Sequence, residues 1–77
     1  MDYKQSRAAR GLLGWSQQKL AEMASVSLAT VQFFETNKHQ PIKNNLTAMR
    51  RALEDACVEF LPARNGKGVG VRLREDK

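Results

Sequence analysis

The sequence has few of the features that mark several large classes of protein. It has one cysteine, Cys57, in 77 residues, so an internal disulfide is excluded and a reducing compartment, the cytoplasm, is expected. The apolar runs are too short to cross a bilayer and no signal peptide is visible, so no membrane partner is expected. Internal repeats and low-complexity tracts are absent. These absences favour one small domain with a modest core.

Residues that carry catalysis or hold metals are equally scarce. The one histidine, His39, has no cysteine or acidic residue at ligand spacing, so neither a metal nor a cofactor is expected. There is no Ser/His/Asp set, and the chain is small for a substrate pocket, so an enzyme is not expected. Gly66, Gly68 and Gly70 follow no strand-to-helix transition and are interpreted as turn residues. We interpret Cys57 as a small buried apolar residue.

What the sequence does have is a basic balance and a helical pattern. Its 13 lysines and arginines outnumber its 8 acidic residues and give a net charge of +5. Such a balance favours nucleic acid or another anionic surface as a partner. The first two-thirds of the chain has the pattern of helices with short breaks, and the last third changes character.

Capping residues predict where the first helices begin and end. A first helix is expected over residues 3–13, with Gly14 as its left-handed cap. Ser16 begins a second helix that runs to about Ala24, and Ser27 begins a third. Two capped helices separated by so few residues cannot be collinear, so they form a tight helical corner. Each of the two later helices also has a hydrophobic staple at its start, formed by Trp15 with Leu20 and by Val26 with Val31.

A polar loop and a fourth helix are expected next. Residues 36–45 are mostly polar and predict the loop. The helix is predicted over about residues 46–56, with Asn44 or Asn45 as its cap. Its apolar stripe consists of Leu46, Met49 and Leu53.

The end of the chain predicts a β-hairpin. Residues 58–61 and 69–74 partly alternate as strands do, and residues 62–68 between them are turn material. A lone two-stranded hairpin is marginal in water, so it must pack on the helices or pair with another subunit. We therefore divide the chain into a helical domain, residues 1–57, and a C-terminal hairpin, residues 58–77, as the dimerisation element. The candidate dimer interface consists of Val58, Phe60, Val69, Val71 and Leu73.

Three segments together resemble one known family. They are SQQKLA at residues 16–21, VSLATV at 26–31 and FE at 34–35, and they resemble the Cro/C1-type helix-turn-helix family of repressors, also called the XRE family. The resemblance covers about residues 4–53. It implies a mainly α fold, a four- to five-helix lambda-repressor-like bundle, to which this chain adds the short C-terminal β-hairpin. It also implies a sequence-specific transcriptional regulator that binds double-stranded DNA as a homodimer.

The resemblance implies roles for individual positions. Gln17 matches a glutamine that holds a backbone phosphate and braces the recognition helix. Lys38 and Lys43 belong to the loop that touches the sugar-phosphate backbone. Arg10 and Glu35 match a pair that forms a structural salt bridge between the first and third helices. The positions expected to face the bases are Ser27, Leu28, Ala29, Gln32 and Phe33.

The turns and the base-facing positions depart from the family pattern. Ser25 and Asn37 stand where glycine is frequent. A non-glycine residue with positive φ costs about 1 kcal/mol or more, and asparagine tolerates it better than most. The base-facing positions lack arginine and lysine, the commonest partners of guanine. Gln32 can pair with adenine, so an A·T-biased site is expected. The residues that can contact thymine methyls are Leu28, Ala29 and Phe33.

Two alternatives follow from a base-facing surface without cations. In one, the protein is an interaction module that uses the helix-turn-helix as a scaffold and docks Leu28 and Phe33 on a regulatory protein partner. In the other, it is an antitoxin-like partner that binds both DNA and protein. For Phe33, two interpretations remain open, either contact with the groove or a partner, or packing at the edge of the core.

Overall fold

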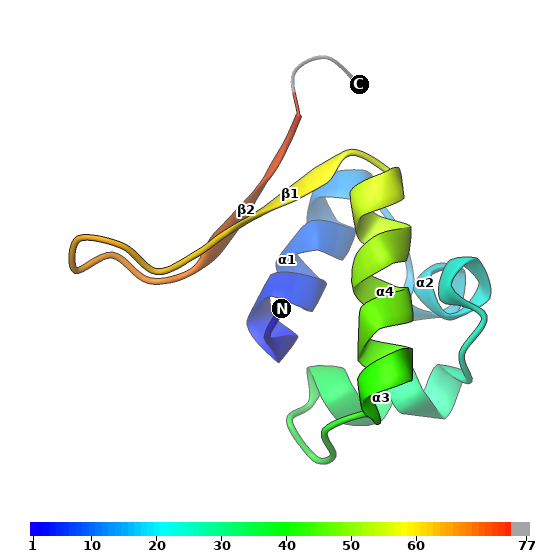
Figure 1. The fold of residues 1–77 in the computed structure, drawn as a ribbon. Coiled ribbons are helices and arrows are strands. Elements are labelled where there is room, and N and C mark those ends of the chain that lie inside the picture. The colour runs from blue at the N-terminus through cyan, green and yellow to red at the C-terminus, as the bar shows by residue number, and fades with distance from the viewer. Residues whose placement is uncertain (75–77) are drawn as a thin grey trace.

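Four helices and one two-stranded hairpin follow one another along the chain (Figure 1). The computed structural model describes residues 1–74, so residues 75–77 of the expected hairpin segment lie outside the described residues. This architecture confirms the predicted mainly α fold with a C-terminal hairpin. The elements are α1 Tyr3–Leu13, α2 Gln17–Ala24, α3 Leu28–Glu35, α4 Lys43–Asp55, β1 Val58–Leu61 and β2 Gly70–Leu73.

The ends of the first three helices follow their capping residues. The hydroxyl of Ser16 accepts from the backbone N–H of Lys19, and the hydroxyl of Ser27 accepts from that of Thr30. Gly14 adopts a left-handed φ of 68° and ends α1. The predicted boundaries of α1, α2 and α3 are therefore confirmed. The capping interactions that set them are local in sequence.

The start of α4 differs from the prediction. The helix begins at Lys43, with Ile42 in the cap position and no side-chain hydrogen bond there. The prediction that Asn44 or Asn45 caps the helix is therefore wrong, because both residues lie inside its first turn. The uncapped turn is closed by the backbone, where the N–H of Leu46 donates to the carbonyl of Ile42 at 3.0 Å. Packing against the rest of the fold stabilises such a turn without a cap.

The core lies where α4 meets the other helices. In Figure 1, α4 runs through the middle of the molecule, with α1 on one side, α2 on the other and α3 across one end. Trp15 and Val26, the outer residues of the two predicted staples, are partly buried and pack against this core. Among residues 1–74, no helix has the length and apolar character needed to cross a membrane. The buried core residues are Ala9, Leu20, Ala21, Ala24, Val31, Phe34, Met49, Ala52, Leu53 and Val58.

The apolar face of the hairpin packs on the helices of its own chain. In the antiparallel register, Val58 pairs with Leu73 and Phe60 pairs with Val71, so all four lie on one face. Val58 is 1% exposed and belongs to the core, and Phe60 and Val71 pack against it. The expectation that Val58 faces a partner is therefore corrected, because that residue is buried in the core of its own chain. Phe60 and Val71 are only partly buried, so their place in a dimer interface stays a prediction. Val69 and Leu73 remain exposed.

Gln5 clamps the hairpin to α1. Its side chain is buried, and Nε2 donates to the carbonyl of Gly70 at 2.9 Å and to that of Leu61 at 3.4 Å. Buried polar groups need such partners, and here the partners are strand carbonyls on both sides of the hairpin. The base of the hairpin is thus fixed relative to α1.

Candidate nucleic-acid interface

The corner between α2 and α3 depends on one left-handed serine. Ser25 has a φ of 57° and serves as the C-cap of α2. The next residue, Val26, donates its backbone N–H to the carbonyl of Ala21 at 3.0 Å and is partly buried. Ser27 then caps α3, so only three residues connect the two helices. The positive φ at Ser25 agrees with the strain expected for a turn without glycine.

One side of α3 is buried and the other is open. Val31 and Phe34 pack into the core, and Glu35 is buried beside them. On the open side, Leu28 is 37% exposed and Phe33 is 43% exposed. The small residues at the start of the helix leave its backbone accessible to a partner. The residues expected to face the bases, which we call the α3 face, are all exposed, namely Ser27, Leu28, Ala29, Gln32 and Phe33.

Phe33 extends the α3 face into the following loop. Its ring meets the ring of His39 edge-on, with 5.6 Å between centroids. The carbonyl of Phe33 accepts backbone hydrogen bonds from Lys38 at 2.8 Å and from His39 at 3.2 Å. The two rings and Ile42, which is 68% exposed, line a shallow pocket of about 290 Å³. Phe33, His39 and Ile42 therefore form an exposed surface, the Phe33 surface, at which Phe33 contacts the loop.

The buried carboxylate of Glu35 connects α3 to α1 and α2. Glu35 is 1% exposed, and Oε1 lies 2.6 Å from Nη2 of Arg10. The hydroxyl of Ser6 donates to Oε2 of the same carboxylate, and Nε2 of Gln17 donates to Oε1 at 3.2 Å. Arg10 and Ser6 belong to α1 and Gln17 to α2, so Glu35 joins three helices. Sequence analysis missed Ser6, which lies 29 residues from its partner.

The environment of Glu35 acts on its pKa in two directions. Burial raises the pKa of the carboxyl, because the charged form loses hydration. Hydrogen bonds from Arg10, Ser6 and Gln17, together with the positive charge of Arg10, lower it. The lowering effects are larger, so the pKa lies below its ordinary value and the carboxylate is charged at neutral pH.

The three residues expected to contact phosphates lie at or beside the ends of helices. Gln17 is the first residue of α2 and uses one amide hydrogen on Glu35, while the amide carries a second. Lys38 follows α3, and Lys43 begins α4. Both lysines are exposed, and neither forms an ion pair within residues 1–74. They stand on either side of the loop that supports Phe33.

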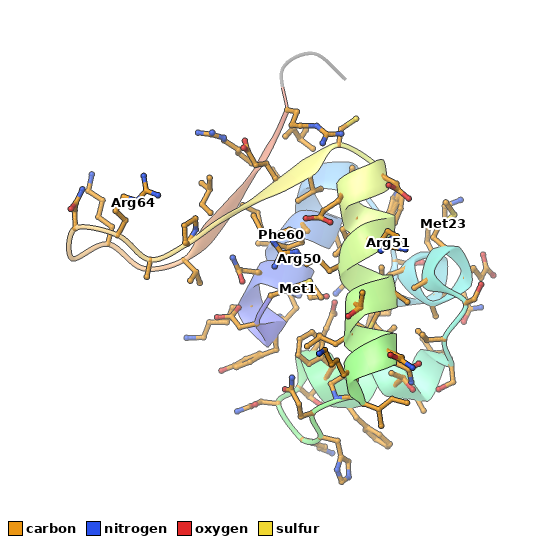
Figure 2. The ribbon with its side chains drawn as sticks, viewed as in Figure 1. Met1, Met23, Arg50, Arg51, Phe60 and Arg64 are labelled. Carbon is orange, nitrogen blue, oxygen red and sulfur yellow. The ribbon has the colours of Figure 1, made fainter. Side chains whose placement is uncertain are left out.

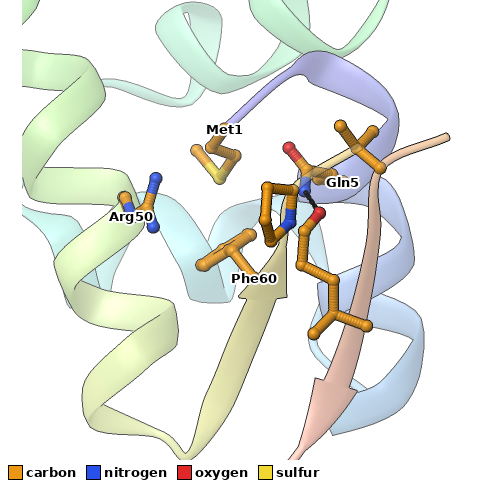
Figure 3. Close-up of a pocket in the computed structure, with 7 residues that line it drawn as sticks. Met1, Gln5, Arg50 and Phe60 are labelled. Carbon is orange, nitrogen blue, oxygen red and sulfur yellow. Dashed lines mark hydrogen bonds between the residues drawn. The ribbon is translucent and has the colours of Figure 1, made fainter. Parts of the chain in front are cut away.

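A second hollow lies beside the middle of α4, away from this surface. It measures about 360 Å³ and opens between the start of α1, the middle of α4 and the hairpin (Figure 3). The guanidinium of Arg50 lies over the ring of Phe60, 4.8 Å from its centroid. Arg50 also pairs with Glu54 at 3.0 Å, so its cation is already satisfied. Among the described residues, no three His, Cys, Asp or Glu side chains gather as a metal site.

A capped helical corner whose second helix exposes one face defines the class of helix-turn-helix proteins, which place that helix on DNA. The family model for Cro/C1-type helix-turn-helix proteins matches residues 7–54, which is more than half of the chain. The chain therefore belongs to this family of DNA-binding transcriptional regulators, also called the XRE family. The match ends within α4, before the hairpin. No curated protein matches the sequence.

Proposed function

We propose that the protein is a sequence-specific transcriptional regulator that reads the major groove with α3. The observation that carries this proposal is the α3 face, which is exposed along its whole length while the other side of α3 is fixed in the core. The major groove admits one α-helix, and its base edges carry a distinct donor and acceptor pattern. A helix held rigidly on one side and open on the other suits that task. The regulator acts in the cytoplasm.

The chemistry of the α3 face favours A·T base pairs. Gln32 offers an amide that pairs with adenine through two hydrogen bonds. Leu28 and Phe33 offer apolar surface to thymine methyl groups, and the short side chains of Ser27 and Ala29 let the helix come close. Guanine lacks its usual arginine or lysine partner here. A good bidentate contact discriminates against the wrong base by about 1–3 kcal/mol.

Affinity comes chiefly from the DNA backbone in this proposal. Lys38 and Lys43 neutralise phosphates on the two sides of the loop, and Gln17 donates its second amide hydrogen to another. The exposed positions of both lysines, without ion pairs in the described part of the chain, support this role. Each neutralised phosphate contributes about −0.9 to the slope of log K against log salt concentration.

The regulator works as a homodimer in this proposal. A dimer places two recognition helices about 34 Å apart, one turn of DNA. Because Val58 is buried in the core of its own chain, a dimer contact through the hairpin uses residues that remain exposed, chiefly Leu73 and Val69. Leu73→Glu is then expected to give a monomer with weaker operator binding, as measured by sedimentation. Removal of the whole hairpin is a poor test, since it takes Val58 out of the core.

Selection of bound sequences from random duplexes tests the function. The expected result is a two-fold site whose half-sites contain essential A·T pairs. A site whose essential half-site bases are all G·C would contradict the proposed readout. Failure to enrich any sequence would contradict specific DNA binding itself.

A second candidate function is supported by the exposed Phe33 surface. In this alternative the α3 face docks on a regulatory protein, or the protein is an antitoxin-like partner of both protein and DNA. The absence of arginine and lysine from the face and the pocket beside Ile42 favour it. A gel-shift assay with competitor DNA separates the candidates, since a docking module shows only weak, nonspecific DNA binding.

A further inference from the structure

The tip of the hairpin is a tight turn that places two cations opposite each other. Asn65 and Gly66 both have positive φ, 56° and 77°, as in a two-residue type I′ turn. The N–H of Arg64 donates to the carbonyl of Lys67 at 3.0 Å, and the N–H of Lys67 donates back at 2.9 Å. Arg64 and Lys67 are therefore direct cross-strand partners.

The positive charges of Arg64 and Lys67 repel each other. Like charges directly opposite each other destabilise a hairpin. Residues 62–69 contain no acidic residue, and neither Arg64 nor Lys67 forms an ion pair within residues 1–74. A different cross-strand pair of the hairpin carries opposite charges, since Nε of Arg72 lies 2.6 Å from Oε1 of Glu59. The hairpin therefore pairs its charges at that position. An external anion would relieve the repulsion at the tip.

The tip also extends beyond the helical body. The hairpin projects past α1, and Arg64 lies at its far end (Figures 1 and 2). All of residues 62–69 are exposed. The chain between Leu61 and the turn spans up to about 13 Å, at about 3.3 Å per residue. Because Gln5 fixes the base of the hairpin to α1, the tip is carried at a defined place.

We propose that Arg64 and Lys67 form a second DNA-backbone contact, which binds phosphates outside the stretch read by α3. The inference rests on the proposed function. A partner that reaches both the α3 face and the hairpin tip must extend past α1, as a duplex does and a small anion does not. DNA carries one negative charge per about 1.7 Å of its axis, so phosphates are available wherever the tip meets it. The arginine fork and the lysine point charge both bind phosphate well.

A double variant, Arg64→Ala with Lys67→Ala, tests the contact in the full chain. Both turn hydrogen bonds join backbone atoms, so the hairpin is expected to keep its shape. Its thermal midpoint is expected not to fall, because the variant removes the repulsion between the two cations. Binding to the selected operator is measured over a range of salt concentrations. The slope of log K against log salt is expected to become shallower by about 1.8, and affinity at 0.1 M salt to fall by up to about 60-fold. Base preference is expected to stay unchanged.

Two controls separate this contact from a general loss of charge. Arg7→Ala with Arg51→Ala removes the same charge from exposed positions on α1 and α4, and is expected to change the slope less. A duplex trimmed to the bases read by α3 removes the outer phosphates. The wild-type chain is expected to lose affinity on the trimmed duplex, while the tip variant binds both lengths alike.

The outcomes distinguish the inference from the function on which it rests. Equal salt slopes for the wild type and the tip variant would overturn the hairpin contact and leave the α3 readout standing. A tip variant that becomes monomeric in sedimentation, with an unchanged slope, would instead assign the tip to a second copy of the chain. A wild-type chain that selects no sequence would overturn the proposed function.

Discussion

Nη2 of Arg10 lies 2.6 Å from Oε1 of Glu35, and this ion pair joins α1 to the end of α3. The same guanidinium donates through Nη1 to the carbonyl of Trp15 at 3.0 Å, so it also holds the turn before α2. Glu35 is almost fully buried, while Arg10 keeps part of its surface in water. The orientation of the α3 face therefore depends on one charge pair beneath it.

Arg10→Ala is expected to destabilise the fold strongly. Breaking a buried pair leaves an uncompensated charge in the interior, which costs about 3 kcal/mol or more. Chemical denaturation of the variant measures the loss. The matched control is Arg50→Ala, which breaks the exposed pair with Glu54 and is expected to cost less than about 1 kcal/mol for that pair. Equal losses in the two variants would show that burial of Glu35 does not matter.

The pKa of Glu35 predicts a loss of stability in acid. Because folding lowers this pKa, the contribution of the carboxylate is fully present above the unfolded value, close to 4.5, and disappears as the pH falls through the folded value. Urea unfolding at a series of pH values is expected to show stability falling below about pH 4.5. In Glu35→Gln this part of the pH dependence is expected to vanish. A variant whose acid transition matches the wild type would assign the effect to other groups.

Ser25→Gly is expected to stabilise the protein by up to about 1 kcal/mol. The serine holds a φ of 57°, a conformation that glycine adopts without the steric cost of Cβ. The greater flexibility of glycine in the unfolded chain offsets part of the gain. Thermal unfolding measures the shift. Ser27→Ala serves as the contrasting change, since it removes the cap of α3 and is expected to cost about 1 kcal/mol.

Gln32→Ala and Lys43→Ala are expected to weaken DNA binding in different ways. Loss of Gln32 should reduce the preference for adenine at one position of each half-site, by about 1–3 kcal/mol. Loss of Lys43 should weaken binding to all sequences alike and reduce the salt slope by about 0.9. Competition assays with single-base operator variants, repeated at several salt concentrations, measure both effects. A change of base preference in Lys43→Ala would make that lysine a groove reader.

The elements predicted best are those whose signals are local. Ser16 and Ser27 cap α2 and α3 through hydrogen bonds that span three residues, so a short window of sequence contains the whole interaction. The start of α4 has no such signal, because its first turn at Lys43 carries no side-chain cap. Tertiary packing determined that boundary, and a polar pattern alone suggested a later one.

The hairpin shows a different limit on what the sequence can predict. The partial alternation predicted the two strands, but it does not say what covers their apolar side chains. Val58 lies against helices of the same chain, whereas the pattern was equally consistent with a second subunit. Gln5 gave no signal at all, since its partners Leu61 and Gly70 lie 56 and 65 residues away. The long-range hydrogen bonds of Ser6 and Gln5 form only in the folded chain, so no short segment of the sequence predicts them.

The shared carboxylate of Glu35 limits how far this DNA-reading unit can be transplanted. A designer who moved only α2 and α3 into another scaffold would carry Glu35 along but leave behind Arg10 and Ser6. The grafted corner would then contain a carboxylate with nothing to neutralise it, and α3 would lose the support that orients it. The smallest portable unit therefore includes α1. Grafting experiments should exchange the exposed side chains of the α3 face and leave the three-helix frame intact.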